Sequence, residues 1–149
     1  MGFVGNKKQC IDQLNSFLRG EMSAVESYQL ALEHVDNTSA ARPQLEACRQ
    51  SHEQRVEIIR TQILRMGGTP SDGAGAWGAF AKVVESSAAL LGDRVAIDAL
   101  EAGEDHGLKD YVTDVKKLDI DTRQLVTSTL LPQQEETHRA MSALKRQLS

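Results

Sequence analysis

The chain has few aromatic residues, few cysteines and no long apolar run. Only 4% of its 149 residues are aromatic, so a folded core must consist mainly of aliphatic side chains. The two cysteines, Cys10 and Cys48, are too few for a disulfide framework or a cysteine zinc site. We therefore expect both thiols to be reduced, with Cys48 in the core as a small apolar group.

Signals for membranes, export and nucleic acids are also missing. No segment approaches the roughly 18 apolar residues of a membrane span, and no apolar run follows the N-terminal lysines as in a signal peptide. The net charge is −4, whereas phosphate binding needs a basic surface. We expect a cytoplasmic protein without a membrane or nucleic acid partner, and nothing in the sequence implies an organic cofactor.

What the chain does contain is helical periodicity. Apolar residues recur at intervals of three and four, which is typical of amphipathic helices. Asp121 and Gln124 resemble a capping box that opens the last helix, and Pro132 should kink that helix because proline lacks a backbone donor. The predicted helices span residues 6–36, 41–66, 94–118 and 121–148, with a short helix at 77–91.

These elements predict an all-α fold in one domain, residues 1–149. Short links join the first two and the last two long helices, so each pair should be antiparallel. A crossover of about 26 residues, which contains the short helix, connects the pairs, as in a ferritin-like four-helix bundle. Trp77 and Phe80 should pin the short helix onto the bundle. Alternatively they form a contact between subunits, and we expect a homo-oligomer, with a dimer favoured.

The first and third long helices resemble each other at an offset of 83 residues. Gly20-Glu21 matches Gly103-Glu104, and Tyr28 matches Tyr111 at the same distance. Helical periodicity explains matched apolar positions, but it does not explain Gly-Glu-x6-Tyr twice in register. This pattern indicates an internal duplication.

The two matched glutamates lie in the middle of apolar helix faces. A buried carboxylate needs a cation, a proton or hydrogen-bond donors. His52 lies on the apolar stripe of the second helix, and Glu135 and His138 form a Glu-x-x-His pair on the last. Glutamate and histidine converging from four helices are typical of a di-iron or di-manganese carboxylate centre. Iron or manganese suits these ligands, with zinc less favoured. The predicted metal ligands are Glu21, His52, Glu104, Glu135 and His138.

Several of these segments together resemble the DUF2383 family of four-helix bundles, which belongs to the ferritin-like superfamily. The resemblance covers nearly the whole chain and implies the fold, while the activity of that family is uncharacterised. The segments that carry it are Leu18-Arg19-Gly20-Glu21 with Tyr28, Gly67-Gly68-Thr69-Pro70, Gly75-Ala76-Trp77-Gly78, and Leu100-Glu101 with Gly103-Glu104-Asp105-His106-Gly107 and Asp110-Tyr111.

The ferritin-like ligand pattern is incomplete in one place. A Glu-x-x-His pair on the second helix would need glutamate at position 49, where this chain has Arg49. Glu101, one turn before Glu104, is an alternative carboxylate, and Tyr28 and Tyr111 would orient carboxylate ligands through their hydroxyls.

Three functions follow as alternatives, the last of them an assembly subunit whose surface, and not its centre, carries the function. The first is a ferritin-like metal protein that oxidises Fe(II) or serves in stress protection. The second is a non-enzymatic structural or interaction protein that has lost the metal. In that protein, the guanidinium of Arg49 would neutralise the buried carboxylates.

Overall fold

The chain folds into long helices that lie side by side. The computed structural model describes the backbone of residues 3–75 and 78–148, with side chains from residue 7 onward, and no strand occurs among these residues. In chain order the elements are α1 (Phe3–His34), α2 (Arg42–Arg65), α3 (Gly78–Leu91), α4 (Asp93–Asp114), η2 (Val115–Lys117), α5 (Ile120–Leu125), η3 (Val126–Leu130) and α6 (Leu131–Leu148).

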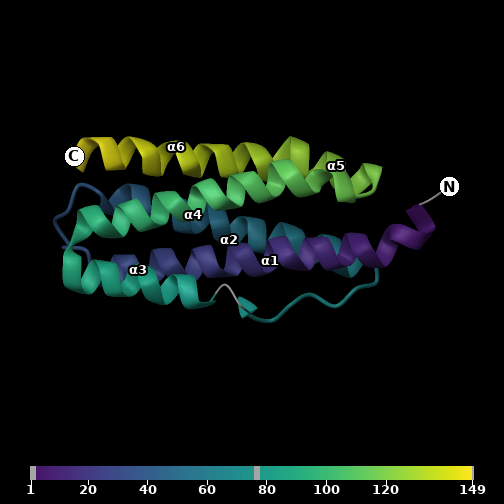
Figure 1. The fold of residues 1–149 in the computed structure, drawn as a ribbon, viewed down its shortest axis with the longest axis horizontal. Helices are drawn as coiled ribbons and strands as arrows, with labels where there is room; N and C mark the ends of the chain where they lie inside the picture. The colour runs from purple at the N-terminus through teal and green to yellow at the C-terminus, as the bar shows by residue number, and fades with distance from the viewer. Residues whose placement is uncertain (1–2, 76–77, 149) are drawn as a thin grey trace.

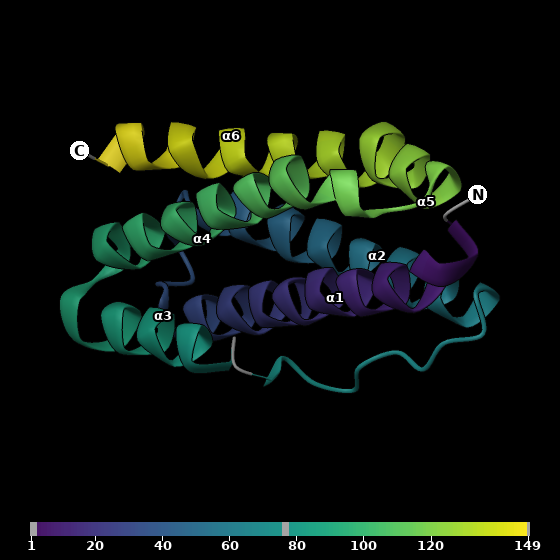
Figure 2. The same cartoon turned by 45° about the vertical axis from the view of Figure 1, so that its right-hand side comes forward.

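The arrangement confirms the predicted four-helix bundle. Helix α1 packs against α2, α4 packs against α6, and α3 contacts both α1 and α4. The connection from α2 to α3 runs back along α1 in both views (Figures 1 and 2). Trp77, where we predicted the short helix to begin, lies outside the described residues. No described helix is both long enough and apolar enough to cross a membrane.

The ends of the helices follow local chemistry. Helix α2 ends at Arg65. Gly67, just beyond the C-cap, has a φ of 79° in the left-handed region, and the amide of Gly68 donates to the carbonyl of Ile63 at 2.9 Å, as in a Schellman motif. The predicted capping box at Asp121 is wrong. Asp119 is the N-cap instead, and its carboxylate accepts from the amide of Thr122 at 2.8 Å.

The last helix is interrupted just before Pro132. Residues Val126–Leu130 form a π-helical turn, in which the amide of Leu131 donates to the carbonyl of Val126. Proline has no amide to bond the carbonyl four residues earlier, and π-turns are a known way to accommodate such a break. The interruption that we predicted at Pro132 is therefore a π-turn on its N-terminal side.

The core consists of two apolar clusters. One surrounds Leu45, Ile97 and Met141, and the other surrounds Leu14, Ile59 and Leu130. Between the two clusters, α1, α2, α4 and α6 contribute buried polar side chains, which we call the polar layer. The layer contains Glu21, His52, Arg55, Glu104, Gln134 and Thr137.

Candidate functional site

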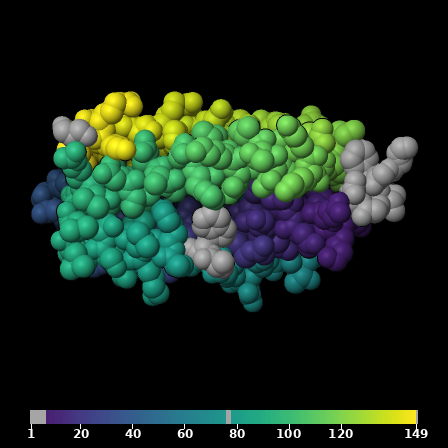
Figure 3. All heavy atoms as spheres, viewed as in Figure 1, coloured from purple at the N-terminus to yellow at the C-terminus, as the bar shows by residue number. Residues whose placement is uncertain are grey.

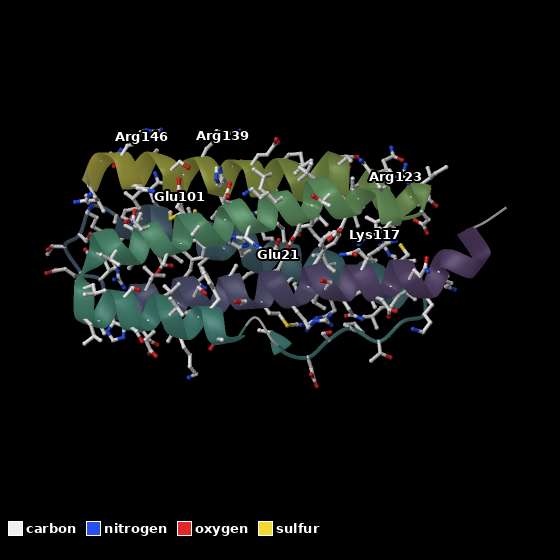
Figure 4. All side chains as sticks on the ribbon, in the orientation of Figure 1. Glu21, Glu101, Lys117, Arg123, Arg139 and Arg146 are labelled. Atoms are coloured by element: carbon white, nitrogen blue, oxygen red, sulfur yellow. The ribbon has the colours of Figure 1, made fainter. Side chains whose placement is uncertain are left out.

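The polar layer places charged side chains out of contact with water. Glu21 is 4% exposed, His52 2%, Arg55 0% and Glu104 3%. Figure 4 shows Glu21 inside the bundle, whereas Arg139 and Arg146 point outward from α6. Charged groups are rarely buried unless they are paired, so their partners define what this layer can do.

His52 stands between the two glutamates. Its Nδ1 lies 2.5 Å from Oε1 of Glu21, and its Nε2 lies 2.6 Å from Oε2 of Glu104. A carboxylate only accepts hydrogen bonds, so both ring nitrogens must donate. The geometry therefore corresponds to a protonated imidazolium that bridges α1 and α4.

The two tyrosines connect α1 and α4 reciprocally. The hydroxyl of Tyr28 on α1 donates to Glu104 on α4 at 2.6 Å, and the hydroxyl of Tyr111 on α4 donates to Glu21 on α1 at 2.6 Å. Both hydroxyls reach a buried carboxylate of the facing helix, whereas a role in orienting metal ligands stays a prediction.

Arg55 is the second cation of the layer. Its guanidinium lies 3.5 Å from Oε2 of Glu21 and donates to Thr137 Oγ1 at 3.0 Å. It also donates to the side-chain carbonyl of Gln134 and to Ser51 Oγ at 3.2 Å. The planar guanidinium of Arg55 thus connects α2 with α1 and α6.

Helix α6 contributes neutral groups. Gln134 Nε2 donates to Glu104 Oε1 at 2.9 Å, and the hydroxyl of Thr137 donates to the same oxygen at 2.7 Å. Together with His52 and Tyr28, these groups give the Glu104 carboxylate four donors, which is about its full capacity.

The environment shifts the protonation equilibria of the layer. Burial alone would raise the pKa of Glu104, but His52 and the donors from Thr137 and Tyr28 lower it to about 2. For Glu21, burial is likewise outweighed by the charges of Arg55 and His52, so its pKa is lowered. Burial opposes the charge of His52, yet Glu104 and Glu21 raise its pKa. These shifts favour the ionised form of both glutamates and the protonated form of His52.

The structure separates two predicted ligands from the others. Glu135 is exposed to solvent, and His138 is half-buried outside the layer, with its Nε2 3.6 Å from Oδ1 of Asp105. The expectation that Glu135 and His138 meet Glu21 and Glu104 is wrong, because α6 turns Gln134 and Thr137 inward.

Two further expectations need correction. Arg49 does not neutralise the buried glutamates, because its guanidinium bonds Glu53 and Glu46 on its own helix, each at 2.9 Å. Glu101 accepts from Lys145 at 3.2 Å and from Ser142 at 2.9 Å between α4 and α6 (Figure 4). In the structure, the neutralising arginine is Arg55.

A signal for the missed residues is present in the sequence. Arg55 follows His52 by three positions, so both belong to the same helix face. Gln134 and Thr137 continue the intervals of four and three that join Leu130 to Met141. An inward stripe that begins at Leu130 therefore contains both residues.

The ring of His52 stands between the two carboxylates. Its two nitrogens diverge, one toward each glutamate. Among the described residues, the group of three whose ligand atoms lie within 4.8 Å of one another is Glu33, His34 and Glu85. These residues are exposed or half-buried, near the end of α1 and on α3.

Comparison with known proteins agrees with this architecture. One similar solved structure is described as ferritin like, diiron-carboxylate proteins from Bacillus anthracis str. Ames. It is 19% identical, covers 96% of this chain and 94% of its own, and has a TM-score of 0.65, which establishes the ferritin-like fold. No curated protein matches. The family described as "Domain of unknown function (DUF2383)" matches residues 9–117, and the chain belongs to this family.

Proposed function

We propose that this chain is a non-enzymatic structural or interaction protein in which protein cations compensate the buried carboxylates. The observation that carries this proposal is the position of His52, whose two ring nitrogens each bond one glutamate. A metal-ligating histidine uses one nitrogen for the ion and the other for a supporting acceptor. Here the carboxylates occupy both sides of the ring.

The available donors do not fit a di-metal carboxylate centre. Such a centre draws carboxylates from four helices and histidine from two of them. Here the layer holds two carboxylates and one imidazole, while α6 contributes the amide of Gln134 and the hydroxyl of Thr137. The guanidinium of Arg55, a permanent cation, lies 3.5 Å from the Glu21 carboxylate, where it would repel an added ion.

The charges of the layer already balance. The carboxylates of Glu21 and Glu104 carry two negative charges, and Arg55 and the imidazolium of His52 carry two positive ones. Each charge has hydrogen-bond partners, so the layer meets the main requirement for buried ions. The balance supports a role in holding four helices in one register rather than in turnover.

Metal binding is the second candidate. It is favoured by the similarity to a structure described as diiron-carboxylate and by the convergence of Glu21, His52 and Glu104 from three helices. Binding at this place would require His52 to release one glutamate and Arg55 to withdraw from another.

The test measures metal content directly. Protein purified without chelators, and protein incubated with Fe(II) or Mn(II) and then desalted, is subjected to elemental analysis. We expect metal well below one equivalent per chain in both samples. Retention of one equivalent or more that disappears in Glu104→Gln would refute the proposal.

Two matched variants locate any metal that is found. Glu135→Gln removes an exposed carboxylate from α6, and Glu33→Gln removes one from the surface group near the end of α1. Metal that is lost with Glu33→Gln but kept in Glu104→Gln would be bound at the surface, and the proposal for the buried layer would stand.

The homo-oligomer expected from the sequence remains a prediction. Leu90 is 81% exposed and Leu91 66% exposed at the end of α3, and an exposed apolar surface of this kind favours self-association. Light scattering of the purified chain would distinguish a dimer from a monomer or a larger assembly.

A further inference from the structure

A cavity lies beside the polar layer, between α1 and α4. Its volume is about 250 Å³, and Gly20, Ala24 and Ser27 line it from α1, while Gly103 and Gly107 line it from α4. Figure 3 shows this face of the molecule, with α4 in green above α1 in purple. Its lining includes the exposed residues Ala102 and His106, so the space is a pocket that opens to the surface.

Gly20 indicates that the space is kept open. Glycine in the middle of a helix is unfavourable relative to alanine. A Cβ at Gly103 would come within 2.7 Å of Phe80, and one at Gly107 within 2.9 Å of Gln134, so close packing explains both. A Cβ at Gly20 would meet no described atom within 4 Å. Packing among the described residues does not require this glycine, whereas any larger side chain would enter the cavity.

The walls of the cavity are aromatic in a chain that has few aromatic residues. Of the six phenylalanine, tyrosine and tryptophan residues in the sequence, four line this space: Phe17, Tyr28, Phe80 and Tyr111. Aromatic rings pack favourably edge to face or offset against another ring. The concentration of rings therefore selects a flat, aromatic occupant.

Buried carboxylates are among the polar residues that line the cavity. Glu21 is one of them, and its carboxylate accepts from His52, Tyr111 and, at 3.5 Å, Arg55. A carboxylate has about four acceptor sites, so Glu21 can accept one more hydrogen bond. Glu104 lines the same cavity, but its four donors leave no such site.

We infer that this cavity binds a small, single-ring aromatic molecule whose hydroxyl or amino group donates a hydrogen bond to Glu21. A void of about 150 Å³ lined by apolar residues is large enough for benzene, so the present cavity accommodates a substituted ring. The inference goes beyond the proposed structural role and holds whether or not a metal binds elsewhere.

The experiment uses phenol and toluene, which share a ring and differ in the donor group. Each is titrated into the full-length protein by isothermal titration calorimetry. We expect saturable one-to-one binding of phenol and roughly tenfold weaker binding of toluene, which corresponds to one hydrogen bond to a charged acceptor. The absence of saturable phenol binding, or equal affinity for both probes, would overturn the assignment.

Gly20→Leu fills the cavity, and Gln29→Leu is its control, since it adds the same side chain to an exposed position of α1. We expect Gly20→Leu to abolish phenol binding and Gln29→Leu to retain it. Circular dichroism verifies that both variants fold, and Gly20→Ala provides a smaller obstruction should the leucine variant fail to fold. Undiminished binding to a folded Gly20→Leu variant would refute the cavity as the site.

Discussion

Replacement of Arg55 tests the buried charge network most directly, because it should lower the free energy of unfolding. Arg55→Met removes the guanidinium but keeps much of the side-chain volume. It leaves Glu21 without its nearby permanent cation, and Gln134, Thr137 and Ser51 each lose a donor. Breaking a buried ion pair by removing one partner lowers the free energy of unfolding by about 3–5 kcal/mol. We expect Arg55→Met to fall within this range.

Arg49→Met is the matched control, because it makes the same change on the same helix. Arg49 bonds Glu46 and Glu53 at the surface, where its side chain is 22% exposed. Exposed pairs of this kind contribute about 0.2–1 kcal/mol each, so Arg49→Met should lower the free energy of unfolding by less than about 2 kcal/mol. The assay is urea denaturation at pH 7, followed by circular dichroism.

The double variant Arg55→Met with Glu21→Gln separates charge from packing. Removing both charges leaves His52 and Glu104 balanced, so the double variant should lose less stability than the sum of the two single variants. For residues in contact, the expected coupling is about 0.5–3 kcal/mol. The reasoning is refuted if Arg55→Met is no more destabilising than Arg49→Met, or if the coupling is zero.

Further predictions concern pH, hydrogen bonding and thiols. Because the pKa of Glu104 is lowered from 4.5 to about 2, its stabilisation is complete above pH 4.5 and is lost toward pH 2; in urea denaturation, Glu104→Gln should flatten this acid dependence. The raised pKa of His52 contributes stability that is complete below its ordinary 6.5 and is lost as pH rises through the raised value, and His52→Gln should remove this loss in the same assay. Tyr111→Phe should lower the free energy of unfolding by about 1.5–3 kcal/mol, since it deletes a hydrogen bond to a carboxylate. Burial raises the pKa of Cys48 to about 12, and Cys10 is fully buried, so a thiol reagent should label neither cysteine until the protein unfolds.

The fold and half of the buried layer could be predicted from periodicity. Glu21 and Glu104 each lie at the centre of an apolar stripe on a long, regular helix, and the structure buries both. Tyr28 and Tyr111 lie two turns further along the same stripes, and each reaches the opposite glutamate. Regular helices preserve their phase over many turns, so the inward residues of α1 and α4 follow from spacing alone.

The last helix could not be predicted in the same way. Two leucines, Leu130 and Leu131, offer alternative starts for the inward stripe, and the choice moves every later position by about 100°. The π-turn before Pro132 adds a local change of phase that periodicity does not show. The Glu-x-x-His spacing favoured the face of Glu135 and His138, whereas the structure buries the face of Leu130, Gln134 and Thr137.

Arg55 was missed for a different reason. Arginine is almost never fully buried unless it is paired, so composition assigns it to the surface by default. Its partners come from α1 and α6, which are far away in sequence, and only the packed bundle brings them together. A local pattern could have identified the position of Arg55 on the His52 face, but it could not have identified those partners.

Helices α1 and α4 contribute matching residues to the buried layer, whereas α2 and α6 contribute different ones. Helices α1 and α4 each supply one glutamate and one tyrosine, 83 residues apart, and exchange hydrogen bonds symmetrically. The inward pair of α2, His52 and Arg55, lies 82 residues before the inward pair of α6, Gln134 and Thr137.

Both cations of the layer therefore come from α2, while α6 offers only neutral donors to Glu104. A second pair of cations on α6 would leave the layer with excess positive charge, and carboxylates there would leave it with excess negative charge. An uncompensated charge at this depth would be strongly unfavourable. Because α2 already carries both positive charges, a balanced layer requires neutral side chains on α6.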